Sequence, residues 1–444
     1  MIAGNTWGPS RPAYLWCLLG VIVSNVFSGH WDAFHLPIGL DRAFFGLMVV
    51  LLILDPWAWR RTALRLRPIH LAMGVLVLLV AFSAAGHNTL LKSYGLFAFL
   101  DRLLVPFLLF LLAPVVFSTQ RRRVLLLRTM VVLGLYLGFT ALMETLGQWR
   151  FVFPSYIGDP SVGIQFGRAR GPFVASEAMG MACSACAFAA AIATVRFRGL
   201  WRAAAVVTVL LAGAGVLESL TRSVWLGTLV GLVLAMGLNR RTRRLLPLAL
   251  VGTAVVVLAM LALVPGLSDS VDTRAGTTRS VYDRANTNAA ALRIVEAHPL
   301  TGVGWTKFID VSQDWVRQAD TYGITNVHIE VHNVVLGRAA ELGVPGALAF
   351  IACILAGPFL AIVRRARGSD PSDLADWRAL SAGVSAVWLV TIMLSPTPYP
   401  LPNTLTWMLA GIALAPYLTR ETSDDGNEAP HGNAVGTAPP GSGA

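Results

Sequence analysis

Long apolar stretches alternate with short polar segments along nearly the whole chain of 444 residues. Each stretch is about as long as the 17–25 residues that a helix needs to cross a bilayer. The polar segments between them contain the arginines, prolines and glycines that are typical of helix ends. The pattern therefore predicts twelve membrane-spanning helices, near residues 13–28, 39–58, 69–85, 100–117, 124–145, 175–195, 203–218, 223–238, 245–264, 343–363, 379–395 and 403–418.

Arginine clusters in the short polar segments predict the orientation of these helices. Each cluster follows an even-numbered span, and the clusters lie within residues 60–67, 121–128, 196–202, 240–244 and 364–367. Because basic residues in short loops stay in the cytoplasm, all five clusters, the N-terminus and the C-terminal tail are predicted to be cytoplasmic. The first apolar stretch lacks a small-residue cleavage site, so we interpret it as a retained helix and not as a signal peptide.

The same orientation puts three polar segments on the opposite face. These are a loop at 146–174, a tight turn near Glu218–Arg222 and the long hydrophilic segment 265–331. Structureless loops of that length are uncommon unless they have a function. We therefore divide the chain into helices 1–9 (1–264), one large and partly helical extracytoplasmic loop (265–331), helices 10–12 (332–418) and a tail (419–444). The tail is rich in Gly, Pro, Ser and acidic residues, which predicts disorder.

The composition predicts an all-α integral membrane protein. The chain is 55% hydrophobic and 13% charged, with a mean hydropathy of +0.63, whereas soluble domains are about 25% charged. Only two of the 35 basic residues are lysines. Arginine binds phosphate through a planar fork, although a GC-rich genome would produce the same excess. Cys183 and Cys186 lie among alanines of a span and are interpreted as packing residues. No disulfide, metal site or nucleic-acid partner is predicted.

Arg222 is the first residue with candidate chemistry. It lies in ESLTRSVWLG, in a turn of a few residues between two apolar stretches. Such a position is near membrane depth, where ionisable side chains are costly and usually functional. The structural alternative is an arginine that reaches to the interface and pairs with Glu218.

The segment 280–305, SVYDRANTNAAALRIVEAHPLTGVGW, is the second candidate. Arg284 lies in a predicted short helix that Pro299 ends, and Gly302 and Gly304 permit a tight turn close to another backbone. A G-x-G pattern alone is a weak indication of phosphate binding, and a plain turn is the simpler interpretation.

His332 is the third candidate, where the long loop re-enters the membrane. A histidine can accept a proton near neutral pH. The helix predicted after it runs to Gly343 and carries Arg338 and Glu341 three residues apart on one face. Histidines are common at membrane interfaces, so position alone does not assign catalysis to His332.

Four ordered segments within residues 170–346 resemble the O-antigen ligase superfamily, which also contains the O-antigen polymerases. His332-Asn333, nine further residues and then Gly343-Val-Pro-Gly346 fit the ligase motif H-[NSQ]-x9-G-x-x-G. Arg284, fourteen residues before His298-Pro-Leu-Thr-Gly-Val-Gly304, is similar to the segment R-x-x-x-W … HPLxGxG, with Asn288 in place of the common tryptophan. Leu220-Thr-Arg-Ser-Val-Trp225 resembles S-R-x-x-W, with Thr in place of Ser, and Arg170-Gly-Pro-Phe173 resembles R-x-G-x-F.

The resemblance implies a GT-C-like glycosyltransferase of the bacterial cytoplasmic (inner) membrane, with its active site on the periplasmic face. Such an enzyme moves a glycan from a polyprenyl-diphosphate carrier to a hydroxyl of a lipid or glycan acceptor, lipid A-core being one candidate. The transfer proceeds with inversion and needs no metal or other cofactor. The resemblance also implies site residues: His332 as general base, Arg222 and Arg284 on the diphosphate, and Arg170, Asn333, Arg338 and Glu341 as supporting residues.

Two other functions stay open. A polymerase that joins carrier-linked repeat units is the alternative within the superfamily. A polytopic transporter is the second alternative, although the predicted spans contain almost no carboxylates, whereas transporters place acidic residues and broken helices at the membrane midplane. A purely structural scaffold would not need the long, arginine-containing loop.

Overall fold

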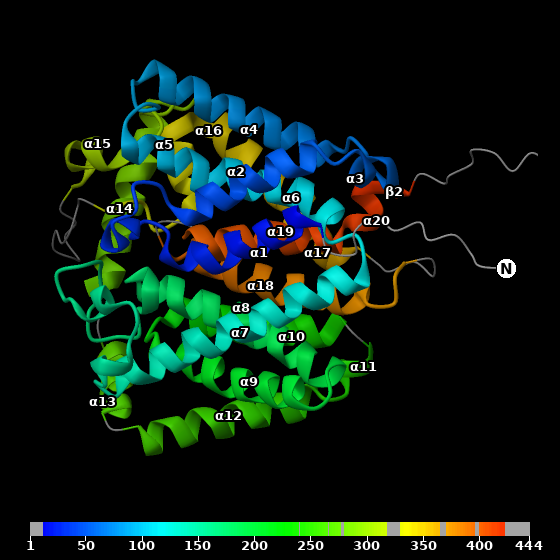
Figure 1. Cartoon of the computed structure of the whole chain (residues 1–444). Coiled ribbons are helices and arrows are strands. Elements are labelled where there is room, and N and C mark those ends of the chain that lie inside the picture. The colour runs from blue at the N-terminus through cyan, green and yellow to red at the C-terminus, as the bar shows by residue number, and fades with distance from the viewer. Residues whose placement is uncertain are drawn as a thin grey trace, which may run out of the picture.

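The computed structural model describes residues 12–238, 240–264, 266–276, 279–317, 329–364, 370–395 and 399–421. Most of the helices run side by side between the two ends of the molecule (Figure 1). Seven helical segments of the described chain are long and apolar enough to cross a membrane: 68–86, 93–116, 120–145, 176–196, 200–218, 246–263 and 334–363. Two shorter apolar helical segments, 13–27 and 222–238, accompany them. The chain is a multi-pass, predominantly helical membrane protein.

The first half of the chain contains nine helices among its described residues. They are α1 (Ala13–Ser24), α2 (Leu40–Ile53), α3 (Pro56–Arg61), α4 (Pro68–Gly86), α5 (Ser93–Phe99), α6 (Val105–Val116), α7 (Gln120–Thr145), α8 (Ser176–Arg196) and α9 (Leu200–Glu218).

The helices of the second half are α10 (Arg222–Leu238), α11 (Arg240–Arg243), α12 (Leu246–Leu263), α13 (Leu267–Gly276), α14 (Arg279–Ala297), α15 (Phe308–Trp315), α16 (Val334–Ile354), α17 (Leu360–Val363), α18 (Leu374–Ile392), α19 (Pro400–Ala413) and α20 (Ala415–Leu418). Strands β1 (Thr62–Leu64) and β2 (Thr419–Glu421) form a two-stranded antiparallel sheet. Strand β2 comprises the first three residues of the tail (419–444) that was predicted to be disordered, and residues 422–444 lie outside the described residues.

Each of the twelve predicted stretches coincides with helix, and two of them begin seven or more residues earlier than predicted. The tenth starts at Val334 and not at 343, and the fourth starts at Ser93 and not at 100, because a π-helical turn at Leu100–Leu104 joins α5 to α6. The charged residues Asp101 and Arg102 lie within this continuous helical segment. They are neutralised within the bundle, by Arg42 on Asp101 at 3.0 Å and by Glu330 on Arg102 at 2.8 Å. The number of membrane crossings stays a prediction.

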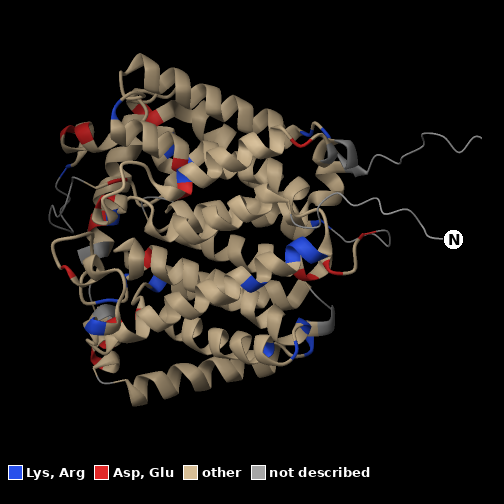
Figure 2. Cartoon of the chain, in the orientation of Figure 1, with Lys and Arg blue, Asp and Glu red and all other residues tan. Residues whose placement is uncertain are grey.

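The two ends of the bundle differ. The helices of the long loop, α13, α14 and α15, lie at one end, and α3, α11 and the small sheet lie at the other (Figure 1). Charged residues gather at both ends, and the middle of the bundle is largely uncharged (Figure 2). The arginine-rich segments and the long loop are thus separated by the length of the helices, as the predicted orientation requires.

Small residues let the central helices approach closely. A Cβ atom on Gly138 of α7 would lie 2.5 Å from the Leu211 carbonyl carbon of α9, and one on Gly134 would lie 2.7 Å from Cβ of Cys186 in α8. Close backbone approach through glycine is a common way to pack helices in membranes, where lipid offers no hydrophobic drive for their association. Cys183 and Cys186 are buried free thiols at this contact.

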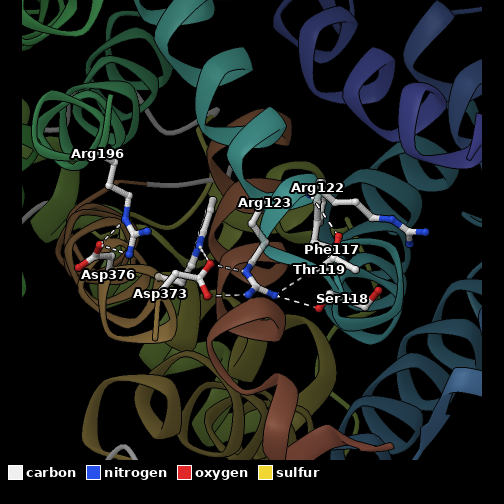
Figure 3. A network of polar contacts seen from close by, with 9 residues as sticks. Phe117, Ser118, Thr119, Arg122, Arg123, Arg196, Asp373 and Asp376 are labelled. Carbon is white, nitrogen blue, oxygen red and sulfur yellow. Dashed lines mark hydrogen bonds and ion pairs between the residues drawn. The ribbon is translucent and has the colours of Figure 1, made fainter. Parts of the chain in front are cut away.

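An ion-pair cluster fastens α18 at the arginine-rich end. Arg123 of α7 donates to both Asp373 carboxylate oxygens, at 2.7 and 2.6 Å, and Arg196 of α8 pairs with Asp376 at 2.5 Å (Figure 3). Arg123 and Asp373 are buried, and Trp377 donates to the same carboxylate. Bidentate pairs of this kind fix geometry as well as charge, so the start of α18 is held against α7 and α8.

Candidate functional site

The turn at 298–304 is fastened to a break in α16. Gly343 has a non-helical backbone (φ 72°, ψ 178°), and Pro345 has no N–H to give to the carbonyl of Glu341. The Val344 N–H donates instead to Pro299 O at 2.7 Å. Two carbonyls of α16 are thereby left without their helical donors.

The turn supplies the missing donors. Val303 N donates to Ala340 O at 2.9 Å, and Gly304 N donates to Glu341 O at 3.0 Å. The glycines of the HPLTGVG and G-V-P-G segments are therefore parts of one structure, in which a loop backbone completes the hydrogen bonds of a broken helix. Both segments are visible in the sequence, but their contact with each other is not.

Gly302→Ala tests this junction. Gly302 has φ +63°, and an added Cβ would lie 2.6 Å from Ala340 O and still closer to the Glu341 backbone. The change should therefore separate the turn from α16, with a loss of several °C in detergent-solubilised thermal stability and of most activity.

Gly337→Ala is the matched control for that prediction. The nearest atom to an added Cβ there is 3.6 Å away, in ordinary contact, and the residue lies within α16. It should be neutral or slightly stabilising. Equal thermal stability and activity in both variants would contradict the proposed junction.

His332 lies directly before α16, and Asn333 is the N-cap of that helix. The Asn333 side-chain oxygen accepts a hydrogen bond from Leu336 N at 3.0 Å, which is the usual way in which an N-cap side chain pairs a free backbone N–H of the first helical turn. His332 is partly buried, and its Nδ1 is enclosed without a hydrogen-bond partner among the described residues. The α16 start therefore sets the position of a histidine with an unused ring nitrogen.

The environment of His332 favours its neutral form. Burial, and after it the nearby positive charge of Arg284, lower the pKa of His332 to about 4, against the opposing charges of Asp283 and Glu330. The ring is therefore neutral at pH 7 and able to accept a proton. The effect of Arg284 also means that these two predicted site residues lie close to each other.

Arg284 and Arg222 come from different parts of the chain and act on each other. Burial lowers the pKa of Arg284, the charge of Glu177 raises it, and the like charge of Arg222 lowers it. The Arg284 Nε is buried without a hydrogen-bond partner among the described residues. Two neighbouring guanidinium groups in a partly desolvated place are costly unless an anion joins them.

The local structure at Arg222 does not contain the pair with Glu218 that would make this arginine structural. Both carboxylate oxygens of Glu218 are buried and accept no hydrogen bond from the described residues. Arg222 is the first residue of α10, after a tight junction in which Leu220 has φ 49°. Thr221 lies 3.1 Å from the Ser176 hydroxyl at the start of α8. The junction that precedes Arg222 therefore lies against the start of α8.

Arg338 and Glu341 form a buried ion pair of 2.8 Å on α16. The Arg338 guanidinium also lies 4.4 Å from the ring centroid of Trp305, which is fully buried. Trp305 follows the 298–304 turn, and its Nε1 donates to Gly95 O at 3.3 Å. These two predicted supporting residues thus connect the first half of α16 with the turn and with α5.

The Arg170 side chain forms hydrogen bonds within the loop that precedes α8. It is 1% exposed, and its guanidinium donates to the carbonyls of Val162, Ile157 and Asp159 at 2.7, 2.8 and 3.1 Å. Its backbone N–H donates to Glu144 at 3.0 Å. We therefore interpret Arg170 as a residue that shapes the loop.

A polar network that was not predicted from the sequence lies beside His332. Arg102 pairs with Glu330 at 2.8 Å and donates to the Tyr94 hydroxyl at 3.1 Å, and that hydroxyl also donates to Glu330. The sequence did contain a signal for Arg102, because a charged residue inside an apolar stretch has a high free-energy cost and is usually functional.

A second pair that sequence analysis missed joins α8 to the start of α19. The Tyr399 hydroxyl donates to the Glu177 carboxylate at 3.1 Å. Since Glu177 also acts on Arg284, the pair borders the candidate site. No local pattern marks two residues so far apart in the chain.

The described part of the site encloses little empty space. A pocket of about 20 Å³ lies next to His332, lined by Arg102, Phe308, Glu330, Val331, Val334, Gly337, Arg338 and Glu341. Residues 318–328, which precede this part of the loop, lie outside the described residues. Within the described ranges, no group of three His, Cys, Asp or Glu side chains is arranged to hold a metal ion.

The fold and the site are those of a multi-pass membrane protein with an extramembrane loop packed on its helices. Residues 207–351 match a family model described as O-antigen ligase. This match confirms the resemblance to the O-antigen ligase superfamily, and it includes Arg222, Arg284 and His332. The match indicates a function of the O-antigen ligase or polymerase type. No curated protein matches the chain in sequence.

Proposed function

We propose that the protein is a glycosyltransferase that moves a glycan from a polyprenyl-diphosphate carrier to an acceptor hydroxyl at the outer face of the cytoplasmic membrane. The observation that carries the proposal is the convergence of three residues from separate elements: Arg222 of α10, Arg284 of α14 and His332 before α16. Two neighbouring guanidinium groups favour a diphosphate, which offers several charged oxygens to their planar forks. A neutral histidine beside them is suited to accept a proton.

The reaction is a single displacement. The acceptor hydroxyl gives its proton to the His332 ring while its oxygen attacks the anomeric carbon of the donor sugar. The bond from that carbon to the diphosphate oxygen breaks, and the electron pair leaves with the polyprenyl diphosphate. Arg222 and Arg284 stabilise the charge that develops on the leaving group, which is the role that a divalent cation has in many other transferases. Attack opposite to the leaving group inverts the anomeric configuration.

Ligase and polymerase activity differ in the acceptor. A ligase transfers a finished glycan once to a lipid such as lipid A-core, and a polymerase transfers it to another carrier-linked unit. Purified protein, given polyprenyl-diphosphate repeat units alone, should leave them unextended if it is a ligase and produce a ladder of lengths if it is a polymerase. Transfer of labelled glycan must be seen in one of the two formats, and it should persist in EDTA. Transport of the intact donor without transfer would instead favour the transporter.

The site is proposed to face away from the cytoplasm. Cysteines introduced at the exposed positions Ser268 of α13 and Asp314 of α15 should react with an impermeant thiol reagent in intact cells. A cysteine at exposed Arg198, between α8 and α9, should react only after permeabilisation. The four native cysteines are buried, so background labelling is low. Labelling of Arg198→Cys alone in intact cells would reverse the orientation.

The pH dependence of transfer should reflect a base with a lowered pKa. Since neutral His332 is the active form and its pKa is lowered to about 4, kcat/KM should be constant near neutral pH and fall as the pH drops through about 4. The bound diphosphate is anionic and stabilises the protonated ring, so kcat should begin to fall at a higher pH than kcat/KM. A loss of kcat/KM centred at the ordinary histidine value of about 6.5 would contradict the buried environment.

A further inference from the structure

Two hollows meet on the surface of α7 and form one groove next to α1. The first, of about 390 Å³, is lined by Leu15 of α1 and by the start of α7: Gln120, Arg121, Arg122, Val124, Leu125 and Arg128. The second, of about 550 Å³, has mostly apolar walls that include Val23, Phe27, Val132, Phe153 and Trp201. Both contain Leu125 and Arg128, so they are continuous. We call this the α1–α7 groove.

One end of the groove carries three arginines, none of which has an acidic ion-pair partner among the described residues. Within the described chain, Arg121, Arg122 and Arg128 form no ion pair. Arg123, on the same turn, is instead paired with Asp373, and in Figure 3 the Arg122 side chain points away from that pair. The positive charge of these three side chains is therefore left for a ligand.

Two of these arginines keep unused donors in enclosed positions. The Nε atoms of Arg122 and Arg128 are buried and have no hydrogen-bond partner in the part of the chain that the structure describes. The Arg122 NH1 donates to the Tyr14 hydroxyl and to Val116 O, both at 3.2 Å, and the Arg128 guanidinium lies 5.0 Å from the Trp201 ring centroid. These contacts orient the guanidinium groups but do not use all of their N–H donors. The remaining donors suit an anion with several oxygens.

The rest of the groove continues from these arginines as an apolar channel. Val132 and Val23, on facing helices, are 53% and 46% exposed. The volume of each of the two hollows is within the range of about 300–1,000 Å³ that is usual for small-molecule sites. A ligand that fills the whole groove therefore needs an anionic head and a long apolar chain.

We propose that the α1–α7 groove binds an anionic phospholipid, with its phosphate on Arg121, Arg122 and Arg128 and an acyl chain along the apolar wall. Basic pockets between membrane helices attract anionic headgroups of the adjoining leaflet. A free phosphate ion would leave the apolar part unused. The candidate transferase residues Arg222, Arg284 and His332 do not line this groove, so the lipid site is separate and does not depend on the proposed function.

Native mass spectrometry of the full-length protein, equilibrated in nanodiscs of phosphatidylglycerol and phosphatidylcholine, tests the proposal. The wild type should retain phosphatidylglycerol in preference to phosphatidylcholine. Each basic residue near a membrane surface contributes about a fivefold preference for anionic lipid, so the combined Arg121→Gln, Arg122→Gln and Arg128→Gln variant should bind it about a hundredfold more weakly. Arg243→Gln with Arg244→Gln removes two exposed arginines from the same end of the bundle and should change binding less than twofold.

A second variant tests the apolar part without changing charge. Val132→Trp fills the channel from a lipid-facing position and should also reduce phosphatidylglycerol retention at least tenfold, whereas Val251→Trp, on the exposed face of α12, should not. Inorganic phosphate at millimolar concentration should fail to displace the lipid. Equal retention of the two lipids by the wild type, unchanged retention in both groove variants, or displacement by phosphate alone would overturn the proposal.

Discussion

His332→Gln should lower the transfer rate by about 10²–10⁴, the usual contribution of a general base. Glutamine keeps a similar size and can hydrogen bond, but it cannot take up the acceptor proton. Binding of the carrier should change little, because the arginines hold the diphosphate, so the loss should appear in kcat and leave KM nearly unchanged. The measurement is transfer of labelled glycan by purified variants, together with retention of polyprenyl diphosphate.

His298→Gln is the matched control for that experiment. His298 is exposed and makes an edge contact with Trp315 at 6.1 Å, outside the group formed by Arg222, Arg284 and His332. It should keep at least half of the wild-type activity. Substantial turnover by His332→Gln would exclude His332 as the base, whichever value His298→Gln gives.

Arg284→Lys and Arg222→Lys should each lower kcat/KM by about 10²-fold. Lysine keeps the charge but replaces the planar fork by a point charge, and loss of one donor to a developing anion commonly costs 10²–10³ in rate. Because the diphosphate carries charge in the ground state and more in the transition state, both KM and kcat should change. Steady-state transfer kinetics with varied donor concentration measure the two parameters.

Arg293→Lys provides the comparison on the same helix. Arg293 of α14 uses one nitrogen to donate to Trp315 O at 2.8 Å, which an ammonium group can replace. It should retain near wild-type kcat/KM and thermal stability. Near wild-type kinetics for both Arg222→Lys and Arg284→Lys would mean that the two arginines have structural roles.

The hydrophobic pattern predicted much of the fold because a membrane helix is defined by its own sequence. Each helix satisfies its backbone hydrogen bonds internally and needs only length and apolarity, so the twelve stretches coincide with helices. The pattern failed at the fourth stretch, which was predicted to begin at 100, next to the charged residues Asp101 and Arg102, whereas the helical segment begins at Ser93. The helix continues there because Arg42 and Glu330, which are far away in the chain, neutralise the pair.

The candidate site was predictable only in part for the same reason. Motif spacing selected Arg222, Arg284 and His332, and the structure brings them near one another. The pairs Arg102–Glu330 and Glu177–Tyr399 were missed, since contacts between distant segments leave no periodic signal. The hydrogen bonds from Val303 and Gly304 to the broken α16 likewise depend on tertiary geometry, although the glycines and Pro345 that permit them are visible in the sequence.

The proposed function requires a polyprenyl-diphosphate-linked glycan as donor. Purified wild-type protein in proteoliposomes should be given the same glycan on polyprenyl diphosphate, on polyprenyl monophosphate or on a nucleotide diphosphate, each with a lipid-linked acceptor and EDTA. We expect transfer only from the polyprenyl diphosphate, with one equivalent of polyprenyl diphosphate released per glycan and inverted anomeric configuration in the product. Transfer from the nucleotide or monophosphate donor, with none from the polyprenyl diphosphate, would contradict the account.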